Sequence, residues 1–225
     1  MTDVSSSAMR WPNQRLYLPA YRFADAARLA RTTPQSVTRW FRGYSVPGHR
    51  MEPVLPMANG GTIISYLQLV EAAFVASFRY LGVDLDRLRR AHRYLRERFD
   101  VEHPFAAYRF ATDGVHVLTQ LGREIVAVDQ GGQLAMAEVI RARAAEFDYE
   151  DGLALRWRPR GPDSVMLVDP RIAFGAPSVQ GVPTSVLKER SRAGEAVDEI
   201  AEDYDLPPSA VLDALDFEGV SPEAA

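Results

Sequence analysis

The chain has 225 residues and a formal net charge of -4, with 47% hydrophobic and 25% charged residues. This is an ordinary globular composition, and the length allows one large domain or two small ones. The absence of cysteine excludes disulfides and thiolate-based metal or redox sites, and four scattered histidines leave little for another metal site. No apolar run approaches the roughly 18 residues of a membrane span, and the N-terminus lacks a secretory signal. We therefore expect a cytoplasmic protein without metal, cofactor or membrane partner.

Charge is divided between the two ends of the chain. Residues 10–50 carry eight arginines against one acid, Asp25, whereas residues 193–225 carry ten acids and no base. A clustered positive field attracts phosphates at short range, and an acidic segment repels them. The basic end is therefore the candidate for nucleic-acid binding.

The first predicted elements form a helix-turn-helix. Residues 1–16 are polar and without periodicity, so we expect a loose N-terminal segment. A helix is predicted at 23–30 and a second at 34–42. Thr33 is a suitable N-cap for the second helix, and Gly43 is a suitable stop.

A hairpin or loop is predicted after these helices, because residues 44–64 are rich in glycine and proline. With the two helices it would complete a winged helix-turn-helix domain over residues 17–64. The segment Leu18–Gly43 also resembles the winged helix of MerR-type regulators.

The second helix has a polar side and an apolar side at 100° per residue. Arginine and glutamine on the polar side can pair bidentately with guanine and adenine. The side chains expected to read bases are Gln35, Thr38, Arg39 and Arg42. Those expected to hold phosphates, from the neighbouring helix or the wing, are Arg22, Arg28, Arg31, His49 and Arg50. Any exposed helix has a polar face, however, and some helix-turn-helix domains bind only protein.

The central residues 65–164 predict a helical pair with a small antiparallel sheet. A single apolar stripe predicts a helix at 65–81, and a second helix, capped by Asp84, is predicted at 84–99. The two look like an antiparallel pair. The other elements predicted around this region are strands at 109–112, 115–118, 125–128, 153–157 and 165–168 and a helix at about 136–147. The arginines from Arg87 to Arg98 are interspersed with Asp84, Asp86, Glu97 and Asp100, so we interpret them as a solvated helix face rather than a second nucleic-acid surface.

No motif indicates catalysis. The central histidines lack a nearby nucleophile motif, and the chain contains neither H-x-x-x-H nor a glycine-rich phosphate loop. The acids Asp148, Glu150 and Asp151 are explained by a turn before a strand. We expect no enzymatic activity.

Residues 169–217 combine short helices, predicted at 184–193, 196–204 and 208–217, with short characteristic sequence stretches, here called anchors, that are separated along the chain. The anchors are Asp169-Pro170-Arg171-Ile172-Ala173-Phe174-Gly175-Ala176-Pro177, Gly181-Val182-Pro183-Thr184, Ala193-Gly194-Glu195, Glu199-Ile200-Ala201-Glu202-Asp203-Tyr204 and Val211-Leu212-Asp213-Ala214-Leu215. In order and spacing they resemble the small helix-turn-helix domain of VapB-type antitoxins over about residues 165–219. Together with the MerR-like segment, this resemblance implies a large antitoxin of a type II toxin–antitoxin pair, with a PIN-domain ribonuclease as partner.

The C-terminal module, residues 165–225, departs from a DNA-binding module in its charge. Its acids would oppose the counterion release that drives DNA binding. We therefore assign DNA to residues 17–50, and packing, dimerisation or toxin contact to the C-terminal module. Arg190 and Arg192 are candidates to reach the metal-binding carboxylates that a PIN active site implies. An equally open interpretation is that the module is a small folded domain whose acids are simply solvated.

The sequence thus predicts an α+β protein. Its expected functions are to bind operator DNA and to neutralise the toxin by direct binding. We expect a homodimer, because one short helix gives little specificity. A free-standing MerR-like regulator with a small ligand in its central domain is an alternative. A third interpretation is an interaction protein that binds no DNA.

Overall fold

The computed structural model contains helices and small antiparallel sheets, which confirms the α+β class. It describes residues 14–55, 57, 61–108, 110 and 130–221. The chain divides into two compact units, one of Met1–Ala145 with Tyr149–Ala154 and the other of Glu146–Asp148 with Leu155–Ala225. Within the described ranges, no helix is long and apolar enough to cross a membrane.

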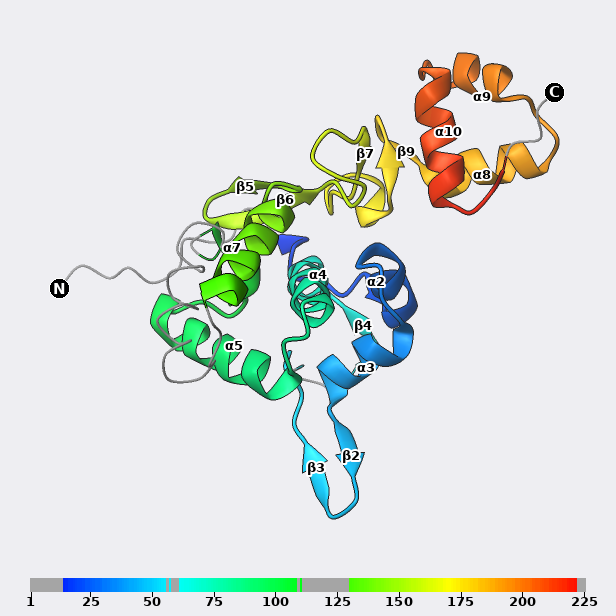
Figure 1. The fold of residues 1–225 in the computed structure, drawn as a ribbon. Helices are drawn as coiled ribbons and strands as arrows, with labels where there is room; N and C mark the ends of the chain where they lie inside the picture. The colour runs from blue at the N-terminus through cyan, green and yellow to red at the C-terminus, as the bar shows by residue number, and fades with distance from the viewer. Residues whose placement is uncertain (1–13, 56, 58–60, 109, 111–129, 222–225) are drawn as a thin grey trace. The chain divides into compact units, whose positions relative to one another are not determined.

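The first unit begins with a short strand and two helices, β1 (Tyr21–Arg22), α2 (Phe23–Leu29) and α3 (Pro34–Arg42) (Figure 1). The bounds predicted for α3 are confirmed. Thr33 caps the helix, and its Oγ1 accepts a hydrogen bond from the backbone N–H of Ser36 at 3.1 Å.

A two-stranded hairpin follows α3 and projects from the body of the unit (Figure 1). It consists of β2 (Tyr44–Val46) and β3 (His49–Met51). The chain then returns to β4 (Ile63–Ile64), which pairs antiparallel with β1. This pairing closes the segment at its two ends, with Tyr21 opposite Ile64.

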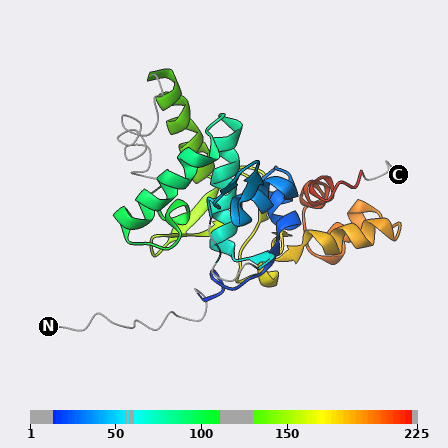
Figure 2. The ribbon, with the colours of Figure 1, turned by 90° about the horizontal axis from the view of Figure 1, so that it is seen from below.

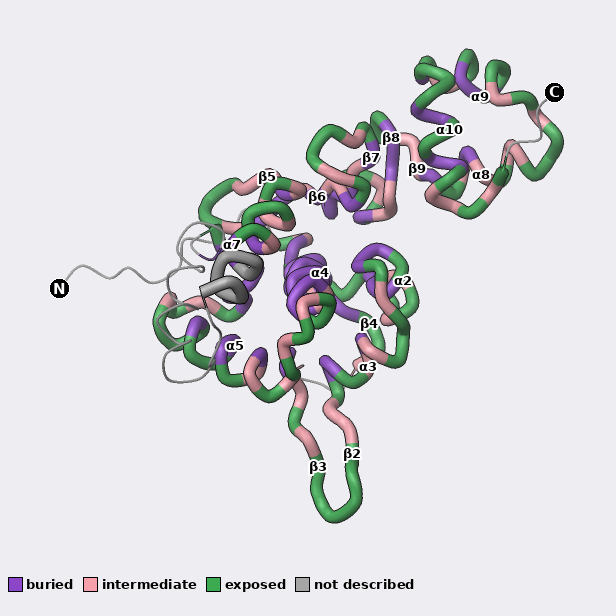
Figure 3. Tube along the Cα trace, in the orientation of Figure 1, coloured by how far each residue is buried: buried purple, intermediate pink, exposed green. Residues whose placement is uncertain are grey.

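Helix α4 (Tyr66–Tyr80) is the core of the first unit. It begins at Ser65, whose hydroxyl accepts from the N–H of Gln68 at 3.3 Å. The predicted single apolar stripe was too narrow, because α4 is buried around most of its circumference (Figure 3). A helix that is apolar on nearly all sides is expected to be covered on all sides.

The predicted antiparallel pair of helices is not what the structure has. Helix α5 (Leu85–Phe99), capped by Asp84 as predicted, runs across α4 rather than alongside it (Figures 1 and 2). The short 3-10 turn η1 (Pro104–Ala106) packs against both helices. Phe105 in this turn lies 6.0 Å from Phe78 of α4 and 5.2 Å from His92 of α5, between ring centroids.

A buried carboxylate joins these three elements. Glu71 of α4 is 2% exposed; its Oε1 lies 2.9 Å from Nε2 of His92, and its Oε2 lies 3.0 Å from Nδ1 of His103. Burial by itself would raise the pKa of Glu71, but the charge of His92 and the hydrogen bonds from both imidazoles lower it to about 2. Burial would likewise lower the pKa of His103, but the hydrogen bond and charge of Glu71 raise it above 6.5.

The centre of the chain differs from the predicted elements. Instead of a helix at 136–147, α7 spans Gln130–Ala144 and packs against α4, and the chain is already extended at Phe147. Most of the strands predicted between 109 and 128 fall outside the described residues. Phe110 is helical, and its ring packs 5.2 Å from Phe74.

A hairpin of β5 (Phe147–Glu150) and β6 (Leu153–Trp157) contributes its tip to the first unit and its base to the second. In the second unit, Trp157 stacks on Phe147 at 5.4 Å. The unit continues with the antiparallel sheet of β7 (Met166–Leu167), β8 (Ser178–Val179) and β9 (Val182–Pro183).

Three helices complete the second unit, α8 (Thr184–Arg192), α9 (Val197–Asp203) and α10 (Pro208–Phe217), close to their predicted bounds. They enclose one apolar core that also takes in residues of β7 and β8: Met166, Val179, Leu187, Ile200, Ala201, Leu206, Ala210, Val211, Ala214 and Leu215. Glu218 joins the ends of the first and last helices, because its carboxylate accepts from Thr184 at 2.6 Å and from Lys188 at 3.2 Å.

The buried pair of Glu71 and His103 predicts a specific pH dependence of stability. The pKa of His103 is raised in the folded state. The pair therefore contributes fully to the free energy of unfolding below pH 6.5, the ordinary pKa of histidine, and this contribution is lost as the pH rises through the raised pKa. Replacing Glu71 with Gln should lower the free energy of unfolding by about 3 kcal/mol. This deficit should be larger near pH 6 than near pH 9.

Urea unfolding of both proteins at the two pH values measures the difference. Glu97→Gln, which removes an exposed carboxylate from α5, is the control and should change stability little. An equal deficit at both pH values would show that the pair contributes no pH-dependent stability.

Candidate nucleic-acid interface

Helix α3 is fixed by its apolar side. Val37, Trp40 and Phe41 are at most 3% exposed, and Phe41 stacks on Phe23 of α2 with ring centroids 5.5 Å apart. This burial leaves the opposite side of the helix at the surface. Of the four side chains predicted to read bases, Gln35, Arg39 and Arg42 are exposed and Thr38 is half-buried.

The hairpin is attached to the C-terminal end of α3 through backbone groups. The carbonyl of Trp40 accepts hydrogen bonds from the N–H groups of Val54 at 2.9 Å and Leu55 at 3.0 Å. The side chain of Arg50 donates to the carbonyl of Arg42 at 3.3 Å. The position of the hairpin therefore follows from the position of the helix.

Aromatic rings and carbonyls hold the exposed arginines of α3. The guanidinium of Arg39 lies 5.7 Å from the ring centroid of Tyr44, and that of Arg42 lies 5.5 Å from Phe23. Arg42 also donates to the carbonyl of Gly61 at 3.3 Å. Such contacts reduce the side-chain entropy lost on binding a ligand.

The hydroxyl of Thr38 differs from the other predicted base contacts, because it donates to the carbonyl of Pro34 within the same helix at 2.8 Å. The cations predicted to hold phosphates are all exposed: Arg22, Arg28, Arg31, His49 and Arg50. Of these, Arg50 is bonded directly to α3, through the carbonyl of Arg42.

The sequence reasoning missed one arginine at this surface. Arg89 of α5 donates to the carbonyl of Glu52, just after the hairpin, from Nε at 3.0 Å and from Nη2 at 2.7 Å. The two residues are 37 positions apart, and the bond is to a backbone oxygen, so no spacing or charge pattern could have indicated it.

The second unit presents the opposite charge. Exposed acids lie on and between its last two helices: Asp198, Glu199, Glu202, Asp203, Asp205, Asp213 and Asp216. The part of the chain that the structure describes contains no group of three or more histidines or acids that could hold a metal ion.

The two arginines predicted to contact a toxin lie in different surroundings. Arg190 is engaged within its own unit: it donates to Glu195 and to Asp203, the latter at 2.6 Å, and lies 5.4 Å from the ring of Tyr204. Arg192, in the last turn of α8, is exposed. The geometry therefore gives Arg190 a role in joining α8 to α9.

Two proteins of Mycobacterium tuberculosis are similar to almost the whole chain. One, named "Putative antitoxin VapB45", is 26% identical, and the match covers 90% of this chain and 95% of that protein. The other, named "Uncharacterized protein Rv2308", is 26% identical over 88% of this chain and 89% of that protein.

The fold is also found in a solved structure, the crystal structure of Rv2018 from Mycobacterium tuberculosis. It superposes with a TM-score of 0.72 over 90% of this chain and 99% of that chain, at 23% identity. A family model described as a protein of unknown function, DUF433, matches residues 167–217. This is nearly the segment whose sequence anchors resemble the antitoxin domain.

The junction between α3 and the hairpin predicts a steric requirement for glycine. Gly43 has φ +70°, and a Cβ added there would collide with the carbonyl oxygen of Met51. We expect Gly43→Ala to lower the free energy of unfolding by about 2–4 kcal/mol.

Gly48, at the tip of the hairpin, is a matched control. Its φ is +77°, but an added Cβ would meet nothing within 4 Å. Gly48→Ala should therefore cost only about 1 kcal/mol, the conformational part of the effect. Equal losses in denaturant unfolding would show that the close approach to Met51 does not constrain the junction.

Proposed function

We propose that this protein is the antitoxin of a type II toxin–antitoxin pair, which represses its own operon by binding operator DNA and neutralises a PIN-domain ribonuclease by direct binding. The observation that carries the proposal is the similarity, over nearly the full length of both chains, to a relative named as an antitoxin. Two surfaces of opposite charge, one in each unit, support a protein with two different partners.

We interpret α2, α3 and the β2–β3 hairpin as a winged helix-turn-helix. The exposed side of α3 would enter the major groove, where Gln35, Arg39 and Arg42 meet base edges. The hairpin would bring Arg50 and His49 to the backbone or minor groove. Arg22, Arg28 and Arg31 would hold phosphates.

We assign the ribonuclease to the second unit. Its exposed acids repel phosphates, so DNA is the less suitable partner for this surface. With Arg190 engaged by Glu195 and Asp203, Arg192 is the better candidate for insertion into a cluster of metal-binding carboxylates.

We expect the antitoxin to act as a homodimer. One α3 covers a short stretch of base pairs, and two copies reading paired half-sites supply the missing specificity. Light scattering of the full chain, alone and on operator DNA, measures the number of copies.

Removing Arg39 tests the DNA interface. The bidentate contact of an arginine with guanine discriminates by about 1–3 kcal/mol, so Arg39→Ala should weaken operator binding roughly 5- to 150-fold. Its affinity for unrelated DNA should fall much less, because base contacts carry the specificity. Fluorescence anisotropy with a duplex from upstream of the gene measures both affinities.

Arg141→Ala is the control, since Arg141 is exposed on α7 and outside the proposed interface. It should bind the operator like the unaltered protein. If Arg39→Ala bound equally well with its fold intact, α3 would not be the reading helix.

Co-expression tests the antitoxin function. The full chain should co-purify with the ribonuclease encoded beside it and restore the growth that the ribonuclease arrests. Arg192→Ala should weaken the rescue, because one charge-assisted contact of about 1.5–3 kcal/mol is lost. Operator binding without any complex or rescue would instead identify a free-standing transcriptional regulator.

A further inference from the structure

Helix α5 carries more positive charge than any other described element. It contains six arginines and two acids, and Asp84 caps it. The interspersed acids led us to expect a solvated face in which the charges cancel. The ion pairs in the structure show that cancellation is confined to the first half of the helix.

The acids at the start of α5 form ion pairs with nearby arginines. Asp84 pairs with Arg87 at 3.0 Å, and Asp86 pairs with Arg89 at 3.0 Å and Arg90 at 3.1 Å. Within the described part of the chain, Arg93, Arg96 and Arg98 form no ion pair. The second half of α5 therefore keeps its positive charge.

Arg93 and Arg96 share a face of the helix with Arg89, which bonds to the residue just after the hairpin. Arg89, Arg93 and Arg96 are spaced i, i+4 and i+7, so their Cα atoms lie within about 60° around the helix. Because Arg89 is bound to the carbonyl of Glu52, this stripe begins at the base of the hairpin. Arg98 is about 180° from Arg89, on the opposite side.

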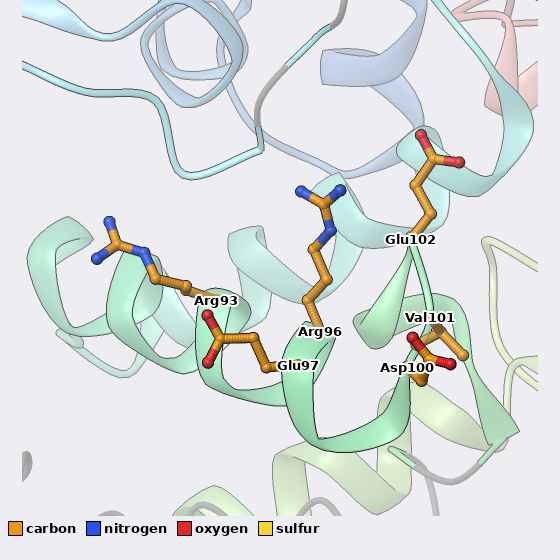
Figure 4. Close-up of a pocket in the computed structure, with 6 residues that line it drawn as sticks. All are labelled: Arg93, Arg96, Glu97, Asp100, Val101 and Glu102. Carbon is orange, nitrogen blue, oxygen red and sulfur yellow. The ribbon is translucent and has the colours of Figure 1, made fainter.

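At the end of the stripe away from the hairpin, the arginines face a hollow in the surface. Arg93 and Arg96 line a hollow of about 630 Å³, and their guanidinium groups project toward the same side (Figure 4). From Arg89 to Arg96 the helix rises about 10 Å. Measured along the axis of B-DNA, one strand carries about three phosphates over that length.

We propose that Arg93 and Arg96 bind backbone phosphates of DNA beyond the base pairs read by α3. The inference rests on the proposed DNA-binding function and deepens it, because it extends the footprint past the hairpin. A guanidinium suits this task, since it stays charged and donates two parallel hydrogen bonds to a phosphate. The contacts are made to the backbone, so they add affinity without sequence preference.

Acids beside the stripe give the proposal a second signature. Glu97, Asp100 and Glu102 line the same hollow, and the carboxylate of Glu102 projects to the same side as Arg96 (Figure 4). A carboxylate there opposes phosphate binding. Removing its charge should therefore strengthen DNA binding, the opposite of removing an arginine.

The test uses the full chain and two operator duplexes, one extended past the hairpin and one trimmed to the base pairs contacted by α3. On the extended duplex, Arg93→Ala combined with Arg96→Ala should weaken binding at least about tenfold in moderate salt. It should lower the slope of log affinity against log salt by about 2. The preference for operator over scrambled sequence should not change, and the trimmed duplex should bind both proteins equally.

Matched variants separate this role from general charge and from folding. Arg98→Ala removes the same charge from the same helix on the opposite side, and its affinity should stay within about twofold of the unaltered protein. Glu102→Gln should raise affinity for the extended duplex. Replacing Arg93 and Arg96 by Gln repeats the test with side chains that preserve helix propensity.

Unchanged affinity of both double variants, or an equal loss in Arg98→Ala, would overturn the proposal while operator binding by the unaltered protein still supports the proposed function. Loss of ribonuclease binding with unchanged DNA affinity would also overturn it and assign the stripe to the protein partner. Failure of the unaltered protein to bind any duplex would overturn both.

Discussion

The arrangement of the first unit depends on the burial of one side of α3. The burial of Val37, Trp40 and Phe41 gives the helix one orientation against α2, which exposes Gln35, Arg39 and Arg42 together. The same helix positions the hairpin, because the carbonyl of Trp40 binds the returning chain. Since packed interiors tolerate little displacement, the buried side of α3 fixes the direction in which its exposed side faces.

Local signals in the sequence were sufficient to predict most helices. Thr33 and Asp84 cap helices as predicted, because a cap depends on residues three positions apart. Contacts between distant residues were not predictable: β1 and β4 are two residues each, too short for a period-2 pattern, and Glu71 meets its histidines 21 and 32 positions away. The crossing of α4 and α5 was not predictable either; η1 packs against both helices.

In the candidate site too, features set by local periodicity were predictable, and contacts set by rotamers and neighbouring side chains were not. The exposure of Gln35, Arg39 and Arg42 follows from helical periodicity, so it was predicted. The bond of Thr38 to its own helix and the engagement of Arg190 by Glu195 depend on rotamers and neighbours. Formal charge was a good guide to which end of the chain is basic, but ion pairing decides where charge remains available, as α5 illustrates.

The central claim is that the basic first unit reads DNA and the acidic second unit does not. Hydrogen exchange of the full chain, with and without operator DNA, tests it directly. Slower exchange is expected in residues 34–51, which comprise α3 and the hairpin, with no change in residues 184–217. Protection of the last three helices, with none in α3, would contradict the assignment of the two units.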